Sequence, residues 1–592
     1  MASTEVLALL AVVPIAIAFG LLVIARWSAA RSMGVGWIVA TALGLAYWQM
    51  DPSWWAAVAL YGALEAVGII LIVFGAILLM NYLDVSGAIS TIRWHFSGIS
   101  TDRRIQLLLI GLGFETIIEG VAGFGTPGAL AAPLLIGLGF PPLGAAVFAL
   151  FFNAPNPQFG AAGTPILGGV NSVIGPEKLA QASEPITQTE FQGLVSAYSG
   201  VMTGLTFVFW GALGVFLLVY WFGDESERSL RGAARAAAPV APFAFVLGTV
   251  AGVTQWAVAW FVGTELPSIV AGFVVFGLGL VMASRRILVP DDTWEFPDRE
   301  SWSDKWLGGL SLDSIEDDDP QKEMPVWLAW TPYLLVGAIL LITRWPTLDL
   351  VPLLQDYTVG IPTVLGYEEL EWSIRYLYLP GTMPFIPVAI LTGLLYRMSG
   401  QKTRKAWGES IRQVAPAALT LVVVVSLTQI MIQSGAYNTG NSVADATNVL
   451  LQGVGFDSID ASGFPGMMDA LSRAVALGAG GALPAVAPWI GALGTFVTGS
   501  NTVSDILFAS LQYDAAGDVG ISRSIIVAIQ NVGGGVGNMV SVQNIAAICG
   551  VVGITGREGD ILRKVIVPTV IFALFTGAVG TILVYVAAPG AF

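Results

Sequence analysis

The chain has 592 residues, of which 55% are hydrophobic and only 11% are Asp, Glu, Lys or Arg. This charged share is less than half of the roughly 25% typical of soluble domains, which excludes a water-soluble fold of this size. The formal net charge is −15, and −9 of it comes from Asp291–Glu323, which holds twelve acidic and three basic residues. Most of the excess charge therefore belongs to one loop.

Apolar stretches long enough to cross a bilayer as helices recur from one end of the chain to the other. At about 20 residues per crossing, the sequence predicts an all-α polytopic integral membrane protein with about 12–14 transmembrane crossings or partial crossings. In chain order, the clearest stretches are Val6–Ala25, Trp55–Met80, Leu194–Trp221, Val414–Ile432 and Val565–Ala587.

Several sequence features argue against catalysis and metal binding. The chain has one cysteine, Cys549, and one histidine, His95. Neither a His/Cys metal site nor a Ser-His pair beyond that single imidazole can be assembled from them, so we expect no enzyme, no cofactor and no metal. The first five residues carry no Lys or Arg, so we expect the first apolar helix to be retained rather than cleaved as a signal peptide.

The short loops between apolar stretches predict the orientation, because Lys and Arg concentrate on the cytoplasmic side. This rule places both termini outside a cytoplasmic membrane. It also places an acidic linker, residues 284–325, inside, between halves 1–283 and 326–592. Only six lysines accompany twenty arginines, a pattern that resembles proteins of salt-loving organisms. The basic loops are Arg26–Arg31, Arg93–Arg104, Arg228–Arg235, Arg285–Arg286, Arg397–Arg412 and Arg557–Lys564.

Each half contains two interruptions of its apolar runs. GVAGFGTPG (120–128) and NAPNPQFG (153–160) lie in the first half, and TGSNTVSD (498–505) and QNVGGGVGN (530–538) lie in the second. The spacings are similar, 27 residues from Thr126 to Asn153 and 29 from Thr502 to Asn531. We therefore expect two pseudo-repeated broken-helix elements, at about 113–166 and about 484–545.

Irregular backbone at membrane depth survives only where it lines a cavity or is buried in protein. Paired, glycine-interrupted segments in corresponding halves indicate the binding site of a secondary transporter. The alternative is that these Gly and Pro residues only allow close helix packing or kinks.

The residues after each first interruption suit helix starts. Thr126 is predicted to cap a helix with Pro127 at its first position. Thr502 and Asp505 have the spacing of a capping box, with Asp replacing the usual Glu or Gln. Two helix N-termini facing one cavity would offer free N–H groups and about half a positive charge each, which suits a carboxylate.

Three glutamates lie in apolar surroundings: Glu65, Glu115 and Glu119. A charged carboxylate at a helix centre costs roughly 2.5 to 3.5 kcal/mol. Glu115 and Glu119 are four residues apart, so they share a helix face and repel when both are ionised. Glu119 adjoins the first glycine-rich break and is the leading candidate for the coupling proton; the alternative is a buried acid bonded to free backbone N–H groups. Asp505 could contact substrate or cation, or only cap its helix.

Longer stretches carry a resemblance to the L-lactate permease family. They are GFETIIEGVAGFGTP (113–127), LLIGLGF (134–140), FGAAGTPI (159–166), ELP (265–267), LGTFVTGSNT (493–502), LF (507–508) and SVQNI (541–545). They span nearly the whole chain.

The resemblance implies proton-coupled symport of L-lactate and related 2-hydroxy-monocarboxylates such as glycolate, by alternating access. It also implies site roles for Glu119 and for Ser500-Asn501-Thr502, a triplet that sodium–dicarboxylate members of the wider ion-transporter group use at broken helices. With the broken-helix argument, the expected substrate-binding residues are Gly125, Thr126, Asn153, Asn156, Gln158, Ser500, Asn501, Thr502, Asn531 and Asn538. The expected proton-coupling residues are Glu119, Glu115 and Asp505.

Two other functions stay open at this point. One is sodium-coupled symport of another organic acid such as a dicarboxylate, with the Ser-Asn-Thr element and Asn153 forming part of a cation site. The other is a membrane sensor or enzyme that binds an anion without moving it. The oligomeric state is open as well.

Overall fold

The computed structural model describes residues 4–592 except 26, 124, 183, 309–320 and 455–456. The described chain is mostly helical with one small sheet, and eleven of its helices are long and apolar enough to cross a membrane. Three shorter apolar helices, at Thr126–Gly137, Pro142–Asn153 and Gly381–Leu395, accompany them. The predicted all-α polytopic membrane protein is confirmed, and the number of crossings, about 12–14, stays a prediction.

One set of elements in the first half runs from a long crossing helix through two broken helices to a second long helix. The short π-helical and 3-10 pieces in it mark the places where the helices deviate from α geometry. In chain order the elements are α3 (Pro52–Ser86), α5 (Arg103–Leu108), η1 (Leu109–Phe114), α6 (Glu115–Val121), α7 (Thr126–Gly137), α8 (Pro142–Asn153), η2 (Pro157–Phe159), α9 (Gly160–Thr164), η3 (Pro165–Val170) and α11 (Gln188–Phe222).

The second half repeats this order with different lengths. Again a long helix precedes a broken hairpin, a broken crossing and a final long helix. The elements are α19 (Gly400–Gln433), α21 (Met467–Ala479), η9 (Gly480–Ala482), α22 (Leu483–Thr498), α23 (Asn501–Val519), α24 (Arg523–Asn538), α25 (Val542–Val552), α26 (Glu558–Ile582) and η10 (Leu583–Ala587).

Each repeat contains a hairpin whose tip lies inside the protein. In the second repeat, α22 and α23 are antiparallel, because Ser504 Oγ donates to the Gly491 carbonyl over 2.8 Å and Gln512 Nε2 to the Ala487 carbonyl over 3.2 Å. In the first repeat, α7 returns to the start of α5, so that Gly139 lies beside the Arg103 guanidinium.

The two hairpins open toward opposite ends of α11. Tyr513, near the end of the second hairpin, packs on Phe191 in the first turns of α11. Gly144, which follows the first hairpin directly, faces Phe222, the last residue of α11. The two repeats are therefore inverted relative to each other.

The long helices α3 and α19 cross side by side and join the repeats. They run antiparallel: Asn81 donates to Ser410 Oγ over 2.9 Å, Trp407 donates to the Tyr82 hydroxyl over 2.9 Å, and Gly62 lies against the backbone of Ser426. Local signals set the boundaries of α3. Asp51 accepts from the Ser53 and Trp54 amides and precedes Pro52, and left-handed Gly87 ends the helix.

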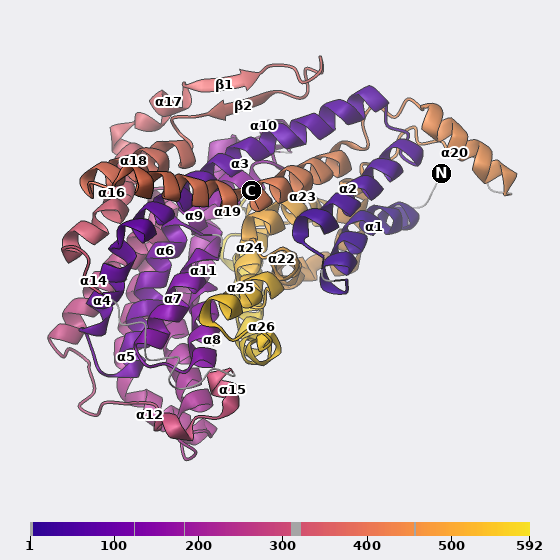
Figure 1. Cartoon of the computed structure of the whole chain (residues 1–592). Coiled ribbons are helices and arrows are strands. Elements are labelled where there is room, and N and C mark those ends of the chain that lie inside the picture. Colours follow the sequence, from indigo (N-terminus) through magenta and orange to yellow (C-terminus); the bar gives the residue numbers. More distant parts are fainter. Residues whose placement is uncertain (1–3, 26, 124, 183, 309–320, 455–456) are drawn as a thin grey trace.

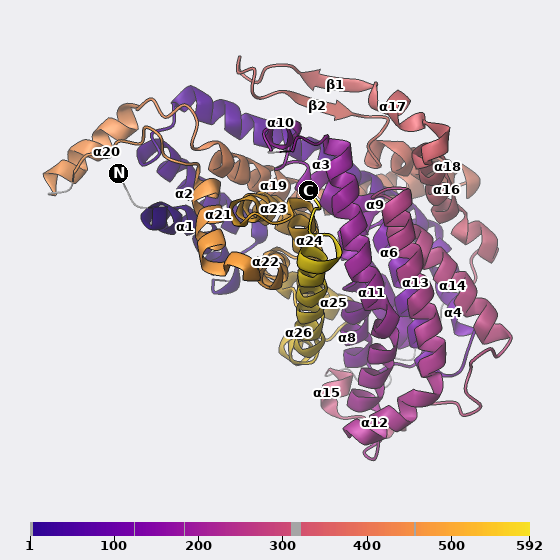
Figure 2. The same ribbon diagram turned by 180° about the vertical axis from the view of Figure 1, so that it is seen from behind.

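The remaining helices cover the repeats, and α11, α13 and α14 lie side by side (Figure 2). A two-stranded antiparallel sheet lies at the top of Figure 1, with Thr358 opposite Arg375. These elements are α1 (Thr4–Val23), α2 (Ala29–Ala46), α4 (Ala88–Ser97), α10 (Pro176–Ala180), α12 (Leu230–Ala237), η4 (Ala238–Val240), α13 (Ala241–Phe261), α14 (Pro267–Ser284), η5 (Arg299–Ser301), α15 (Asp304–Leu307), α16 (Val326–Arg344), η7 (Pro346–Leu348), α17 (Leu350–Gln355), β1 (Thr358–Ile361), β2 (Trp372–Arg375), η8 (Gly381–Phe385), α18 (Ile386–Leu395) and α20 (Ser442–Gly453).

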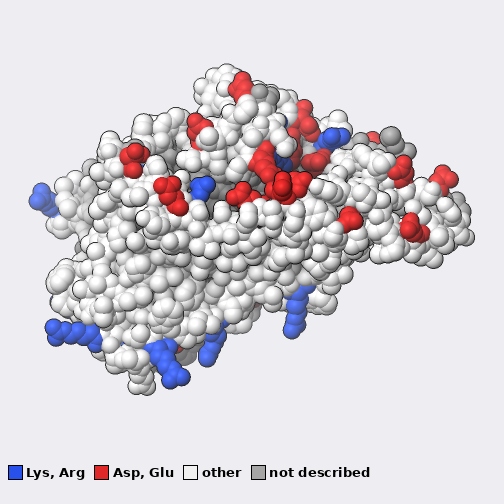
Figure 3. Space-filling view, turned by 90° about the horizontal axis from the view of Figure 1, so that it is seen from above, with Lys and Arg blue, Asp and Glu red and all other residues white. Residues whose placement is uncertain are grey.

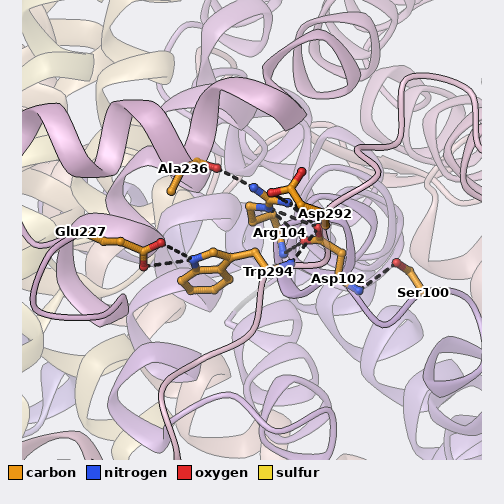
Figure 4. A network of polar contacts seen from close by, with 7 residues as sticks. All are labelled: Ser100, Asp102, Arg104, Glu227, Ala236, Asp292 and Trp294. Atoms are coloured by element: carbon orange, nitrogen blue, oxygen red, sulfur yellow. Dashed lines mark hydrogen bonds and ion pairs between the residues drawn. The ribbon is translucent and has the colours of Figure 1, made fainter.

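Three segments that contain or adjoin basic loops meet around a fully buried guanidinium (Figure 4), at the end of the molecule where Figure 1 shows α5 and α12. Arg104 pairs with Asp102 over 2.6 Å and donates to the carbonyls of Ala236 and Asp292 over 2.5 and 3.1 Å. Its contacts join the loop before α5, the end of α12 and the segment after α14. Trp294 adds a bond from its indole to the Glu227 carboxylate, at 3.1 Å. Arg26 of the first basic loop lies outside the described residues.

Both described termini lie at the opposite end. Helix α1 packs antiparallel on α2, with Gly36 against Pro14 and Ala18, so the start of α1 lies beside the end of α2. The Phe592 carbonyl accepts from Ser522 and Ser524, near the start of α24.

Seen from above, the face with the sheet carries Asp and Glu side chains gathered near its middle (Figure 3). Burial, together with the nearby Glu369 and Glu371 carboxylates, raises the pKa of Glu177 on this face. The acidic face and the basic loops thus lie at different ends. The division into halves 1–283 and 326–592 around linker 284–325 stays a prediction, and residues 309–320 of that linker lie outside the described residues.

Candidate functional site

The first hairpin tip is built by glycines in left-handed conformations. Helix α6 ends at Val121, and Gly123 (φ 59°) and Gly125 (φ 77°) lead into α7. Gly125 is the N-cap, so the prediction that Thr126 caps this helix is wrong. Thr126 is already helical and its amide donates to the Gly123 carbonyl over 3.0 Å. A residue with φ near +77° favours glycine, which has no Cβ, over threonine. Phe124, also in this tip, lies outside the described residues.

The second hairpin tip uses a side-chain cap. Helix α22 ends at Thr498, Gly499 follows with φ 74°, and Ser500 is the N-cap of α23, its Oγ accepting from the Val503 amide over 3.4 Å. The predicted capping box of Thr502 and Asp505 is therefore wrong, because both residues are inside the helix. Ser500 lies in extended backbone one residue before the first helical turn, the geometry that an N-cap requires.

The second broken crossing is interrupted later than predicted. Helix α24 continues through Asn538, and α25 begins at Val542, so residues 530–538 are helical. The glycines of this stretch serve close packing instead: added Cβ atoms at Gly533 and Gly537 would collide with α22 at Pro488 and Ala492. The counterpart of Asn153, the last residue of α8, is therefore Asn538, the last residue of α24, and not Asn531.

A partly open cavity lies where the two tips and the two broken crossings meet; its empty space of about 300 Å³ includes the solvent at its mouth. Its lining combines both helix N-termini with backbone from the breaks, and Glu119 is the one ionisable side chain among the described residues of that lining. The lining residues are Glu119, Gly123, Gly125, Pro157, Gly160, Thr164, Pro165, Gly499, Ser500, Asn501, Thr502 and Asn538.

Glu119 is 3% exposed and is held by amides from both repeats. Asn153 Nδ2 donates to Glu119 Oε2 over 2.8 Å, and Asn538 Nδ2 donates to Asn153 Oδ1 over 2.6 Å. The other carboxylate oxygen, Oε1, lies against Gly160, where any Cβ would collide with it. The carboxylate thus occupies a fitted position between the two repeats.

Asn501 is the corresponding polar side chain of the second tip. Its Nδ2 donates to Asn531 Oδ1 over 2.9 Å, and Asn531 donates in turn to Ser199 Oγ over 3.2 Å. Asn501 Oδ1 is buried without a hydrogen-bond partner among the described residues and lies against Gly534, where a Cβ would collide with it.

The structure places six of the thirteen predicted site residues in the cavity lining: Gly125, Ser500, Asn501, Thr502, Asn538 and Glu119. Asn153 contacts the lining through Glu119 and Asn538, and Asn531 through Asn501. Asn156 and Gln158 lie behind it and close the break after α8 by donating to the Phe152 and Pro155 carbonyls. Thr126 is next to the lining residue Gly125.

The other two predicted acids are fully buried outside the lining. Neither Glu115 oxygen has a hydrogen-bond partner among the described residues. Asp505 Oδ1 accepts from Gln530 Nε2 over 3.3 Å, while its Oδ2 has no partner within that described set. Their predicted role in proton coupling stays a prediction.

Sequence reasoning missed six lining residues, among them Gly160 and Thr164. Both lie in the FGAAGTPI stretch, which was singled out by resemblance but not assigned a role. Its backbone is unusual: Ala161 and Ala162 have φ of 42° and 51°, so the chain turns where a helix would otherwise continue.

Comparison with known proteins gives one family model and several similar sequences. The family model described as L-lactate permease matches residues 7–587. The L-lactate permease of Escherichia coli K12 is 28% identical over 94% of this chain and 92% of its own. A putative L-lactate permease of Haemophilus influenzae is 28% identical over 85% of both chains, and the glycolate permease GlcA of E. coli K12 is 27% identical over 98% and 96%. Among solved structures, Neisseria gonorrhoeae MtrF, described as an antimetabolite efflux pump, aligns with TM-score 0.37 and 13% identity over 90% of this chain and 84% of its own.

Proposed function

From the membership of this chain in the L-lactate permease family and from the geometry of its cavity, we propose that it is a proton-coupled symporter. Its substrates are L-lactate and related 2-hydroxy-monocarboxylates such as glycolate, the compounds named for its relatives. It works by alternating access in a cytoplasmic membrane. By the distribution of basic loops, both termini are extracellular.

The observation that carries the proposal is the composition of the cavity. Two helix N-termini, at Gly125 and Ser500, face it, and the lining residues that the structure describes include one carboxyl group and neither Lys nor Arg. Each N-terminus offers unpaired N–H groups and about half a positive charge, so together they suit one carboxylate. The 2-hydroxyl of the substrate then meets Ser500, Thr502 or Asn538.

Glu119 carries the coupled proton. A lactate anion and an ionised Glu119 in one narrow cavity would repel each other, so the substrate enters together with a proton on Glu119. One anion moving with one proton is electroneutral. Each pH unit across the membrane then supports about tenfold accumulation, or about 1.4 kcal/mol.

The inverted repeats support alternating access. Each hairpin separates the cavity from one end of the protein. The open end of the first hairpin lies at the basic end, and the open end of the second lies at the opposite end. Movement of one hairpin tip away from the other would expose the same residues to one side at a time, as in other transporters with inverted repeats.

Purified protein in liposomes tests the proposal. We expect labelled L-lactate to accumulate under an imposed pH gradient, acid outside, without sodium and with the membrane potential clamped at zero. Excess unlabelled glycolate should compete, and protein-free liposomes give the background. Absence of pH-driven accumulation would overturn the proposal.

One observation favours a second candidate, sodium-coupled symport of an organic acid. Asn501 Oδ1 and Thr495 Oγ1 are both buried without a hydrogen-bond partner among the described residues, and both lie near Gly534. Oxygen atoms without donors are potential cation ligands. Accumulation that requires a sodium gradient at equal pH on both sides would select this candidate.

A further inference from the structure

A third asparagine extends the contacts of Glu119 into α25. Asn544 Nδ2 donates to two oxygen atoms of Asn538: the side-chain Oδ1, and the main-chain carbonyl over 3.3 Å. Asn544 does not line the cavity, and the sequence stretch that contains it suggested no role for it. With Asn153 and Asn538 it forms a continuous chain of amides that ends on Glu119 Oε2.

While Asn544 is present, the donors and acceptors along this chain of amides have only one possible orientation. The main-chain carbonyl of Asn538 accepts and cannot donate, so it turns the NH₂ group of Asn544 toward Asn538. The second Asn544 hydrogen then occupies Asn538 Oδ1, which leaves the Asn538 NH₂ group for Asn153 Oδ1. Asn153 must therefore present its NH₂ group to Glu119.

The source of this polarity is the break in the second repeat. Asn538 is the last residue of α24, and the final carbonyls of a helix lack intrahelical partners. The interruption therefore supplies an acceptor, the Asn538 carbonyl, at the far end of the chain of amides. Because this carbonyl requires a donor, it fixes the orientation of the Asn544, Asn538 and Asn153 side chains, and Asn153 in turn presents a donor to Glu119. Glu119 meets a donor, and a donor stabilises the ionised carboxylate more than the protonated one.

No other ionisable group near Glu119 in the described chain favours its ionisation, so the amides have this role. The elements packed against α6, namely η1, α7, α8, η2, α9 and α14, contain no Asp, Glu, His, Lys, Arg, Tyr or Cys in the described chain. Within the described chain, the one titratable neighbour is Glu115, on α6 itself, and it makes no hydrogen bond to Glu119. The local donor that favours ionisation is Asn153.

We propose that Asn544 is a positioning residue that acts through Asn538 and Asn153 to favour proton release from Glu119. The inference rests on the proposed role of Glu119 as the proton site. Without Asn544, the amides of Asn538 and Asn153 are free to turn over, and Asn153 can offer its oxygen to a protonated Glu119. Proton binding then becomes easier and proton release harder.

Infrared difference spectroscopy of the purified protein tests this without any substrate. A protonated buried carboxyl group has its own C=O stretching band, and the band absent from Glu119→Gln belongs to Glu119. Asn544→Leu keeps the approximate shape of the side chain and removes the donor. We expect the pH midpoint of the Glu119 band to rise by about one unit, a tenfold tighter hold on the proton.

Gln543→Leu is the matched control, since Gln543 is the preceding residue of α25 and contacts the Val497 carbonyl rather than the amides. It should leave the midpoint unchanged. Asn544→Ala serves as a second variant if the leucine disturbs folding. An unchanged midpoint in a folded Asn544 variant, or an equal rise in Gln543→Leu, overturns the proposal.

Uptake measurements separate this inference from the proposed function. The pH midpoint of lactate uptake should rise in Asn544→Leu, and this effect of Asn544→Leu should vanish in the Glu119→Gln background. If the wild-type protein moves no lactate but the Glu119 band shifts as expected, the proposed function fails and the role of Asn544 stands. An Asn544 effect that persists in Glu119→Gln shows that Asn544 acts elsewhere.

Discussion

The two hairpin tips have the same backbone design and different chemistry. The first, at Gly123 and Gly125, has no side chain at its cap and brings a carboxyl group, Glu119, to the cavity. The second, at Ser500, has a hydroxyl cap and brings an amide, Asn501. The inverted repeats thus place helix N-termini on both sides of the cavity, while among the described lining residues only the first repeat carries an ionisable group. In the proposed mechanism, coupling therefore belongs to the first tip and neutral recognition to the second.

The largest effect should come from removing the carboxyl group of the first tip. Glu119→Gln is expected to abolish uphill lactate uptake, so that the tenfold accumulation expected for one pH unit falls to equilibration. Exchange of internal for external lactate should persist, since the amide stays compatible with substrate binding. Liposome uptake and counterflow measure the two activities. Undiminished pH-driven accumulation in this variant would remove Glu119 from the mechanism.

Adding a methyl group against the polar side chain of each tip should distinguish the roles of the two tips. Gly160→Ala forces a methyl group against Glu119, and Gly534→Ala forces one against Asn501. Overpacking of this kind costs about 1 to 3 kcal/mol, so about tenfold weaker lactate binding is expected for each. Only Gly160→Ala should also displace the pH midpoint of uptake. A displaced midpoint in Gly534→Ala would contradict the division between the tips.

Exchanging the caps tests whether the two tips are interchangeable. Ser500→Ala should lower stability by about 1 kcal/mol and Ser500→Gly by a few tenths, because glycine tolerates the cap conformation. Gly125→Ser should cost about 1 kcal/mol or more, since the φ of 77° strains a side chain. Thermal unfolding in detergent ranks the three. Equal losses for Ser500→Gly and Ser500→Ala would mean that the hydroxyl has no role as a cap.

The smallest effect on lactate binding, and a control for the other variants, concerns a cap outside both tips. Thr187 and Glu190 form a capping box at the start of α11. Thr187→Ala should lower stability by about 1 kcal/mol without changing the affinity for lactate or its dependence on pH. A loss of affinity here would show that general destabilisation, rather than tip geometry, explains the other variants.

The sequence predicts the broken helices well and their details poorly. Membrane-length apolar runs and their glycine-rich gaps locate both tips, because polar and flexible residues at membrane depth have few other uses. The predicted helix break at 530–538 is wrong, since glycines that allow α24 to pack on α22 look the same in sequence as glycines that end a helix.

Contacts between repeats are the part that one sequence cannot supply. Glu119, Asn153 and Asn538 were all named as candidates, but their direct bonds join residues 34 and 385 positions apart. The residue spacing predicted a capping box of Thr502 and Asp505, but Ser500, in extended conformation, is the N-cap of the helix. Asn544 lies in the SVQNI stretch that carries the family resemblance, but the sequence assigned it no role, because its importance depends on which oxygen lies opposite.

The opposed directions of α7 and α23 have an electrical consequence. Both helices start at the cavity and run toward opposite ends of the protein, so their macrodipoles point against each other and their far-reaching fields cancel. What remains is local: about one unit of positive charge at the centre, half from each helix. A monoanion neutralises this charge, whereas a dianion leaves a negative charge without compensation in a medium of low polarity. In the proposed mechanism, the two helix N-termini therefore favour a ligand with one negative charge over a ligand with two.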